Sequence, residues 1–460
     1  MSSEVLDELG RLVGDGGAYF VGGCVRDVRL GLPVTDVDVV VPGDPATVAR
    51  RLARETGGSP FALSEAHGAW RVVLDGRTLD ITAQRGGDIL ADLGERDFTV
   101  NAMAIPVDGD GEASVVDPFG GLGDLAEGRL RLVSERVFTD DPLRLLRLAR
   151  IAHELGFEVD SDAERLARRD AHLADRPAGE RIYAEVRRLM TPDHPDAAVR
   201  LLDGLGVLDV ILPEAAPMHG CEQSPFHHLD VFEHTLQVLD ASADIAAHPE
   251  HYLPRHAESL RAALDQTVGD ELDARTALRL AVLFHDIEKP STRTVSDDGR
   301  IGFMGHDRKG AETAARILKR WRAATSTIRF CALLVAEHLR LGFMVHDRPI
   351  DRRDGYRYLK ATAPHTHASV VVSLADRFAT RGVRARQAYV RAHTQTADEL
   401  LQVVAELESE DREPLLRGDE ISDMTGATGP RIGQLVDALA EEQAAGAVTT
   451  RDEAVAFVSG

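Results

Sequence analysis

The stretch that decides the fold is GGCVRDVRLGLPVTDVDVVV, residues 22–41. Two glycines open a short helical pattern, and Asp36 and Asp38 then lead into a run of valines. Alternate side chains of a strand point to one face, so these two aspartates place their carboxylates side by side. Such a pair is costly unless cations lie between the charges. The sequence therefore predicts a strand–helix–strand unit over residues 17–41 with a metal site on its second strand.

The acidic pair suits Mg²⁺, which prefers carboxylate oxygens and binds phosphate oxygens of a substrate. Two such ions ~3.5–4 Å apart can activate an attacking hydroxyl and stabilise a leaving phosphate. Gly22 and Gly23 can bring backbone N–H groups close to a triphosphate, and Arg26 can add positive charge there. The best-placed third carboxylate is Asp80, on a neighbouring predicted strand. We expect a site for phosphoryl transfer whose catalytic carboxylates are Asp36, Asp38 and Asp80.

The predicted fold class is α+β, a small N-terminal head with a largely antiparallel sheet followed by mostly helical regions. Residues 72–83 alternate like a hairpin with its turn at Asp75-Gly76, and residues 98–107 fit either a helix start or a strand. From Thr139 onward helical periodicity dominates, and Thr139 or Asp140 can cap a helix whose first turn holds Pro142. Further helices are predicted over 162–170, 179–190, 195–205, 231–246, 273–284, 308–322, 326–338, 366–378, 396–409 and 429–445.

Composition narrows the class of protein. The 460 residues are 43% hydrophobic and 28% charged, which is typical of a globular chain of about three domains. No apolar run is long enough for a transmembrane helix, and the N-terminus lacks the apolar region of a secretory signal. The three cysteines are far apart, which argues against a disulfide framework or a cysteine zinc site. We expect a cytoplasmic protein without a membrane partner.

Five ordered motifs carry a family resemblance. Residues 22–41 are followed by ERDFTVNAMA (95–104), DPFGGLGDL (117–125), DDPLRLLRLAR (140–150) and ERIYAE (180–185). In this order they resemble the CCA-adding enzyme and bacterial poly(A) polymerase family, class II tRNA nucleotidyltransferases of the polymerase β-like superfamily. The resemblance implies a palm-like nucleotidyltransferase head over residues 1–120 and a helical neck over 121–218 that selects the nucleobase and binds RNA.

Individual roles follow from this resemblance. It implies that Asp36 and Asp38 are Mg²⁺ ligands. Glu95 replaces the first arginine of a family motif, so that one basic contact differs here. The residues that the resemblance assigns to nucleotide binding are Gly22, Gly23, Arg26, Asp27, Arg96, Asp97, Asp141, Arg144, Arg147 and Arg150.

Asp141 and Arg144 are suited to choosing a base. Three residues apart on a predicted helix, they share a face. Cytosine and adenine both present an amino donor next to a ring-nitrogen acceptor, which an aspartate and an arginine can match. Uracil and guanine present the reverse order, and each mismatched group would be left unpaired at ~1–3 kcal/mol. The pair therefore predicts selection of C and A without a nucleic-acid template.

A second constellation lies in the latter half of the chain. Histidines and aspartates recur in the order H…HD…H…H…D, and imidazole with carboxylate suits a divalent metal. The series resembles the HD phosphohydrolase superfamily, which implies an HD domain over residues 219–390 with a helical tail over 391–460. Glu288 stands where that family usually has glycine. The implied metal ligands are His234, His285, Asp286, His306, His338 and Asp376, holding Mn²⁺, Ni²⁺, Fe²⁺ or Mg²⁺.

The net charge of −23 argues against a nucleic-acid partner, but the chain also has local basic stretches that can contact phosphates. Arginine binds phosphate through two N–H groups at once. We expect RNA contacts from Arg181, Arg187, Arg188, Arg320 and Arg322. The sequence thus favours an enzyme that adds CMP and AMP from CTP and ATP to tRNA 3′ ends, with an additional HD phosphohydrolase activity. Two alternatives stay open: a poly(A) polymerase or CC- or A-adding enzyme, and an HD phosphohydrolase with an RNA-binding head. The oligomeric state is left open.

Overall fold

The computed structural model describes residues 17–34, 36–64, 68–74, 77–107, 115–382, 387–410 and 412–460. The chain divides into two compact units, residues 1–177 with 201–211 and residues 178–200 with 212–460. The four predicted regions stay a prediction, and helix α22 (Gln387–Ser409) runs through the boundary expected near 390. In the described part of the chain, no helix is long and apolar enough to cross a bilayer.

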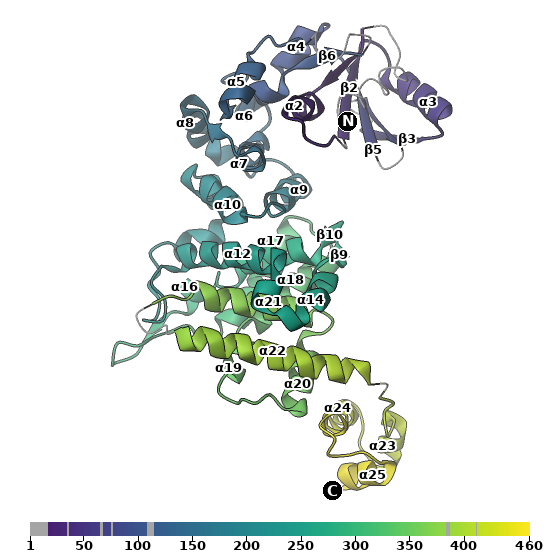
Figure 1. Cartoon of the computed structure of the whole chain (residues 1–460), viewed down its shortest axis with the longest axis vertical. Helices are drawn as coiled ribbons and strands as arrows, with labels where there is room; N and C mark the ends of the chain where they lie inside the picture. Colours follow the sequence, from purple (N-terminus) through teal and green to yellow (C-terminus); the bar gives the residue numbers. More distant parts are fainter. Residues whose placement is uncertain are drawn as a thin grey trace. The chain divides into compact units, whose positions relative to one another are not determined.

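A six-stranded sheet with strand order β3-β4-β5-β2-β1-β6 forms the centre of the first unit (Figure 1). Strands β2 and β5 run parallel and the other neighbours antiparallel, as expected for a largely antiparallel sheet. The strands are β1 (Tyr19–Val21), β2 (Asp36–Val41), β3 (Ser59–Ser64), β4 (Ala69–Leu74), β5 (Arg77–Ala83) and β6 (Ala104–Pro106).

Alternation along these strands gives the sheet two different faces. Helix α3 (Pro45–Thr56) begins at Asp44, whose side chain accepts from two backbone N–H groups, and packs on β3, β4 and β5. Val37, Leu79 and Val72 form a fully buried row across β2, β5 and β4. The residues that alternate with them, including Asp36 and Asp38, therefore point to the opposite face.

Helices complete the first unit beside the sheet. The strand–helix–strand prediction for 17–41 is confirmed, and residues 98–107 hold a 3₁₀ turn followed by a strand. The elements are α2 (Gly23–Leu30), α4 (Ile89–Gly94), η1 (Thr99–Asn101), α5 (Gly121–Glu127), α6 (Val137–Asp140), α7 (Arg144–Leu155), α8 (Ser161–Asp170), η3 (Ala171–Leu173) and α11 (Leu208–Ile211), with the short strands β7 (Arg129–Leu130) and β8 (Glu158–Val159).

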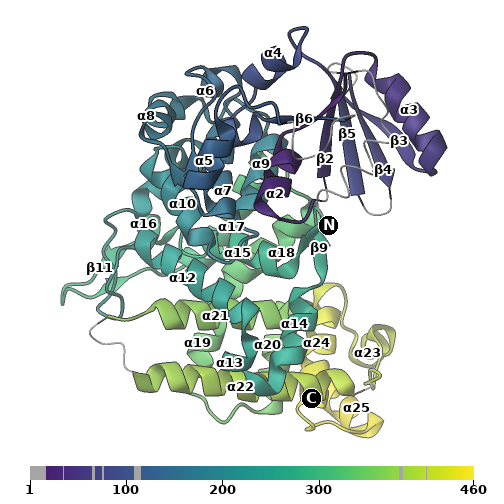
Figure 2. The same cartoon turned by 45° about the horizontal axis from the view of Figure 1, so that its top comes forward.

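The second unit is almost entirely helical, and α12, α15, α18 and α21 pack against one another in it (Figure 2). Helix α15 is buried along nearly its whole length, and Asp273 caps its first turn. The main helices are α9 (Gly179–Leu189), α12 (Val231–Ala247), α14 (Ala257–Leu264), α15 (Ala274–Phe284), α16 (Lys289–Thr292), α17 (His306–Arg320), α18 (Thr325–Glu337), α19 (Arg340–Met344), α20 (Arg352–Thr362), α21 (Thr366–Ala379), α23 (Gly418–Thr425), α24 (Pro430–Ala444) and α25 (Arg451–Ser459). Helix α10 (Pro195–Gly204) contributes residues to both units.

Most sequence predictions of helices are confirmed with ends shifted by one or two residues, whereas 396–409 is part of the longer α22. The predicted cap at Thr139 or Asp140 is wrong, because both residues lie in α6 and the next helix begins at Arg144. The residue before a proline avoids the helical conformation, and Asp141 accordingly has φ −144° and ψ 99°. Strands β4 and β5 form the expected hairpin, whose Asp75-Gly76 turn lies outside the described residues.

Candidate functional site

The three predicted catalytic carboxylates share one face of the head sheet. In the parallel register Asp38 lies opposite Asp80, and Asp36 lies opposite Thr78, whose hydroxyl donates to the Asp36 carboxylate. Both Asp80 oxygens accept from Arg71 on β4, from Nε at 2.6 Å and from Nη2 at 2.7 Å. Folding therefore brings the expected aspartates together and adds an arginine that the sequence analysis did not single out.

The backbone comes close to these carboxylates at Gly22. This residue has φ +77°, and a Cβ there would lie 3.0 Å from both Asp38 Oδ2 and Arg96 Nη1. Desolvation raises the pKa of Asp38, and the charges of Asp80 and Asp36 add to that rise, while Arg96 opposes it. Three carboxylates on one sheet face, with the pKa of Asp38 raised, form a donor set that fits a hard divalent cation.

A polar network connects the predicted phosphate loop to helix α7 of the first unit. Arg26 donates from Nη1 to Asn101 Oδ1 at 2.8 Å, and Asn101 donates to Asp97 Oδ1 at 3.1 Å. Asp97 also accepts from Arg147 Nη2 at 2.6 Å. Asn101 links Arg26 to Asp97 in this network. It lies within the ERDFTVNAMA motif, but the sequence analysis did not identify it as a site residue.

Three further ion pairs involve residues that the sequence analysis assigns to nucleotide binding. Asp27 accepts from Arg26 Nε at 2.8 Å. Arg96 pairs with Asp92, a fully buried aspartate that sequence reasoning also missed, at 3.0 Å. Arg150, predicted to bind nucleotide, is 6% exposed and pairs with Glu154 at 2.8 Å.

The predicted base-selecting pair does not lie on one helix face, which corrects the sequence analysis. Asp141 is extended between α6 and α7, and Arg144 is the first residue of α7, with its N–H donating to the Asp141 carbonyl at 3.1 Å. The Arg144 guanidinium donates from Nη2 to the carbonyl of Glu95 at 2.6 Å. Burial lowers the pKa of Arg144, while the carboxylates of Asp97 and Asp141 act against that. A turn, rather than a helical spacing, holds the two residues near each other.

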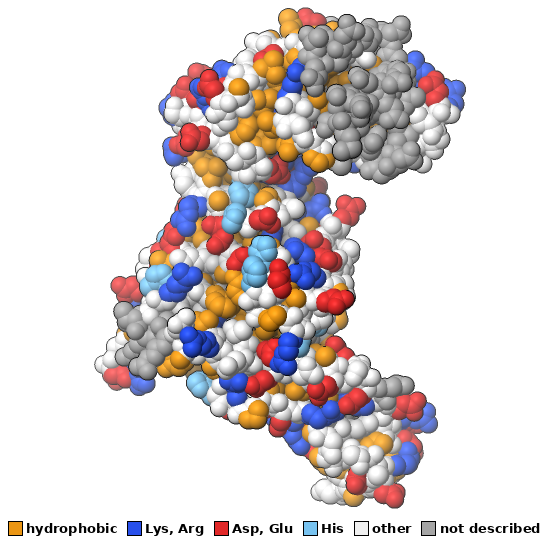
Figure 3. Space-filling view, viewed as in Figure 1, with side chains coloured by type: hydrophobic (Ala, Val, Ile, Leu, Met, Phe, Trp, Pro, Cys, Tyr) orange, Lys and Arg blue, Asp and Glu red, His pale blue; other side chains and the backbone are white. Residues whose placement is uncertain are grey.

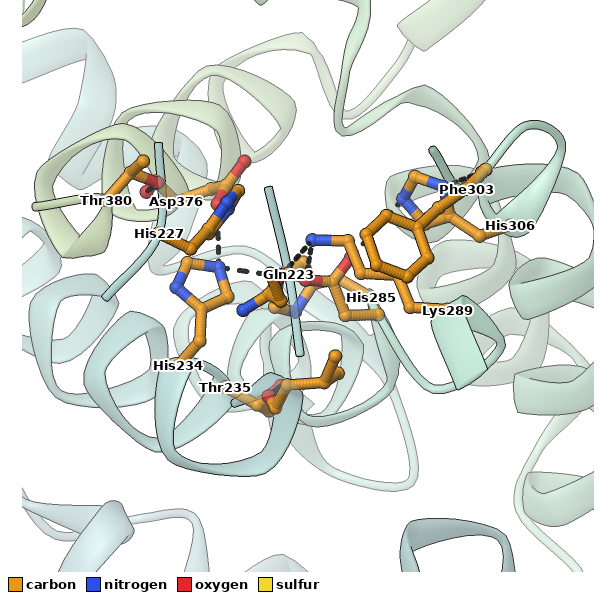
Figure 4. A network of polar contacts seen from close by, with 12 residues as sticks. Gln223, His227, His234, Thr235, His285, Lys289, Phe303, His306, Asp376 and Thr380 are labelled. Atoms are coloured by element: carbon orange, nitrogen blue, oxygen red, sulfur yellow. Dashed lines mark hydrogen bonds and ion pairs between the residues drawn. The ribbon is translucent and has the colours of Figure 1, made fainter. Parts of the chain in front are cut away.

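The second unit gathers the predicted HD ligands from helices α12, α17 and α21 and from the segments that follow α15 and α18. Figure 4 shows His234, His285, His306 and Asp376 of this set. His234 of α12 lies 3.0 Å from Asp376 of α21, measured from Nε2 to Oδ1. His285 and Asp286 follow α15 directly, and His285 Nε2 is 3.1 Å from Asp286 Oδ2. His306, which begins α17, and His338, which follows α18, place their Nε2 atoms 3.3 Å apart. Asp286 connects the three pairs, since its Oδ2 lies 3.6 Å from His234 Nε2 and its Oδ1 lies 3.3 Å from His306 Nε2. The six side chains therefore form one cluster around a shared space.

The electrostatics of this space suit a divalent metal. The ligand atoms form buried triads that share Asp286, and both Asp286 oxygens and His285 Nε2 are buried without a well-aligned hydrogen bond. Burial lowers the pKa of His234, and that of His338 to about 4, so both imidazoles are neutral ligands near pH 7. Burial would raise the pKa of Asp286, but His285 and Lys289 lower it well below its usual range. Neutral His234 and His338 and an ionised Asp286 are the ligand forms that such metals require. His285 differs, because burial would lower its pKa but Asp286 raises it, so a metal would have to displace its proton.

Three further residues in this space were missed as site residues. His227 lies beside His234 with ring centroids 4.8 Å apart, and it can share a metal with His234 and Asp376. Lys289 Nζ lies 2.6 Å from Asp286 Oδ2 and donates to Gln223 Oε1 at 2.8 Å. His227 belongs to the histidine set that the sequence shows, whereas Gln223 has no sequence signal.

Glu288, the departure from the HD family pattern, causes no strained turn. It has φ −101°, a conformation that any residue adopts, so glycine is not required there. Its carboxylate accepts from Thr313 Oγ1 at 2.6 Å and pairs with Lys309 at 3.0 Å. Glu288 therefore ties the turn after the ligands to α17.

The arginines predicted to bind RNA have different surroundings. Arg320 pairs with Glu214 at 2.7 Å and Arg322 with Glu180 at 3.4 Å. Arg187 donates to the carbonyl of Asp270, whereas Arg181 and Arg188 are exposed. On the visible face of the second unit, basic and acidic side chains alternate (Figure 3). Their contacts with RNA stay a prediction.

Comparisons with known proteins place this geometry in a family. The chain matches the models of the poly(A) polymerase head domain over residues 18–131, the probable RNA- and SrmB-binding site of polymerase A over 156–218, and the HD domain over 231–381. It is 37% identical to the A-adding tRNA nucleotidyltransferase of Deinococcus radiodurans, over 96% of this chain and 95% of the relative. The chain belongs to the tRNA nucleotidyltransferase family.

Other family members support the same placement. The CC-adding tRNA nucleotidyltransferase of Thermus thermophilus is 35% identical, over 96% of this chain and 93% of the relative. Among solved structures, a CCA-adding enzyme with ATP matches with a TM-score of 0.64 at 19% identity, covering 99% of this chain and 94% of that one. The Thermotoga maritima CCA-adding enzyme complexed with tRNA-CCA matches with a TM-score of 0.60 at 20% identity, covering 98% of this chain and 94% of that one. The chain is thus a nucleotidyltransferase with this family's fold, and both of its domain types imply dependence on divalent metal.

Proposed function

We propose that the protein adds C and A residues from CTP and ATP to the 3′ ends of tRNA, which completes or repairs the CCA end. The observation that carries the proposal is the row of Asp36, Asp38 and Asp80 on one sheet face beside the glycine loop. The family membership supports it, since relatives of nearly full length are tRNA nucleotidyltransferases.

In this proposal the tRNA 3′-hydroxyl attacks the α-phosphate of the bound nucleotide and pyrophosphate leaves. Asp36 and Asp38 would hold Mg²⁺, which when bound would activate the hydroxyl and neutralise charge on the phosphates. Gly22 allows the backbone to approach the triphosphate, and Arg26 adds charge. Asp141 accepts from the amino group of C or A, and Arg144 donates to the ring nitrogen.

A-only addition is the second candidate, because the A-adding relative is 37% identical over nearly the whole chain. CC-only addition is also a candidate, because the CC-adding relative is 35% identical over nearly the whole chain. These outcomes differ in product length. A tRNA ending at its discriminator base, and one ending in CC, are incubated with single nucleotides and with CTP plus ATP. CCA addition extends the first by three nucleotides, A-only enzymes extend only the second, and a long A ladder would contradict the proposal.

The HD cluster supports a second activity, hydrolysis of a phosphoester such as a 2′,3′-cyclic phosphate or a 2′-phosphate. Its basis is the buried set of imidazoles and carboxylates around Asp286. These residues would hold Mn²⁺, Ni²⁺, Fe²⁺ or Mg²⁺, and the metal would supply activation of a water for the attack on phosphorus. Opening of 2′,3′-cyclic AMP to 2′-AMP or 3′-AMP, and release of phosphate from 2′-AMP, are measured with each metal in turn, and the Asp286→Asn variant should lack the activity.

A further inference from the structure

The sheet face that carries Asp38 continues outward beyond the predicted catalytic carboxylates. In the register Asp38 lies opposite Asp80, Asp80 opposite Arg71, and Arg71 opposite Phe61. Neighbouring strands lie about 4.8 Å apart, so this row places Arg71 roughly 10 Å and Phe61 roughly 14 Å from β2. The row leads from the carboxylates to β3, the edge strand of the sheet.

The outer part of this face, Phe61, Arg71 and Val73, is called the outer face here. Phe61 is 45% exposed and Val73 is 39% exposed although both are apolar, and the Arg71 side chain is 33% exposed. Helix α3 packs on the other side of the sheet, where its Arg50 lies over the ring of Trp70. An exposed aromatic ring beside an arginine is the arrangement with which RNA-binding sheets stack bases and hold phosphates.

Arg71 is fixed in place but keeps donors for an anion. Its bonds to Asp80 use Nε and Nη2 in a bidentate fork. Among the described residues, none accepts from Nη1. The fork therefore orients the guanidinium while one edge stays available to a phosphate oxygen.

The position of the outer face relative to the nucleotide loop indicates its occupant. The predicted phosphate loop lies between β1 and α2, and β1 and β5 flank β2 on opposite sides. The attacking and leaving oxygens of a phosphoryl transfer lie on opposite sides of the phosphorus. With the nucleotide phosphates on the β1 side, the attacking strand arrives from the β5 side, over β4 and β3.

We infer that the outer face docks the 3′-terminal nucleotides of the acceptor RNA, with Phe61 stacking on a base and Arg71 binding a phosphate. The inference deepens the proposed function and rests on it. It adds to the site two residues that position the attacking strand.

Steady-state kinetics with the full-length chain test the inference. Phe61→Ala is expected to raise the KM for tRNA roughly tenfold, the usual effect of losing one stacked base, with the KM values for CTP and ATP unchanged. Phe61→Tyr should retain the wild-type value. Arg71→Met should raise the KM for tRNA and reduce the slope of log affinity against log salt by about 0.7. Leu32→Ala and Arg54→Met, at exposed head positions away from this face, are the matched controls.

A binding measurement separates this inference from the proposed function. A tRNA lacking its 3′-terminal residues carries 2-aminopurine next to its end, and quenching reports stacking. Quenching by the wild type and Phe61→Tyr but not Phe61→Ala supports the inference, whether or not nucleotides are incorporated. Equal quenching by all three would overturn it, and so would a loss of kcat in Arg71→Met without a change in tRNA KM or salt slope. Absence of incorporation by the wild type would overturn the proposed function instead.

Discussion

Asp97 is a buried carboxylate that stays ionised. Burial would raise its pKa, but the charge of Arg147 and the hydrogen bonds from Asn101 and the Phe98 N–H lower it to about 2. A lowered folded pKa contributes stability that is present above pH 4 and lost as the pH falls toward 2. Asp97→Asn should therefore reduce the free energy of unfolding by about 2 kcal/mol at pH 7. Urea unfolding should show this loss shrinking below pH 4, and Asp140→Asn, at an exposed position, should change little.

We propose that base choice also depends on single residues. If Asp141 and Arg144 read the Watson–Crick edge, Asp141→Ala should raise incorporation of U and G relative to C and A by roughly 5- to 100-fold, since each unpaired group costs ~1–3 kcal/mol. Competition between labelled nucleotides measures the ratio. Arg136→Ala, at an exposed position just before α6, is the control. Unchanged selectivity in Asp141→Ala would assign base choice to other residues.

At the scale of elements, α15 is tied to the end of α9 by Arg279. This side chain is 1% exposed, and its Nη1 donates to the carbonyls of Met190, Thr191 and Pro192 at 2.7–2.8 Å. Arg279→Met would leave three carbonyls without their donor, and we expect a loss of about 3 kcal/mol or more. Urea unfolding should show it, whereas the exposed variant Arg261→Met should lose less than about 1 kcal/mol. Equal losses would contradict the structural role of Arg279.

The elements also show what could be predicted from the sequence. Local patterns sufficed for β2, α12 and α15, since strand alternation and helical periodicity depend on neighbouring residues. The turn at Asp141 was missed because helical spacing was extended through Pro142, although the residue before a proline avoids the helical conformation. Contacts such as Arg71 with Asp80, and Lys289 with Gln223, join residues 9 and 66 positions apart. Strand register and tertiary packing decide these contacts, and no local pattern reports them.

At the scale of the whole molecule, we propose a separate metal-ligand set in each unit. Removal of divalent ions should abolish phosphoester hydrolysis and lower the unfolding temperature of the second unit by about 5 °C, because bound metal stabilises the folded state by mass action. Readdition of Ni²⁺ or Mn²⁺ should restore both. In Asp286→Asn, which should lack hydrolysis from the start, removal and readdition of metal should not change the unfolding temperature. Asp240→Asn, in an exposed His-Asp cluster, should behave as the wild type. Equal stabilisation of Asp286→Asn by metal would place the ion elsewhere.

The measurement that tests the central claim most directly is transfer of α-labelled nucleotides to tRNA by the wild type and by Asp38→Asn and Asp286→Asn. Each of the four nucleoside triphosphates is supplied singly and in competition, with Mg²⁺. The account predicts label from CTP or ATP but not from UTP or GTP, loss of at least two orders of magnitude in Asp38→Asn, and retention in Asp286→Asn. Label from all four nucleotides, or undiminished transfer by Asp38→Asn, would contradict it.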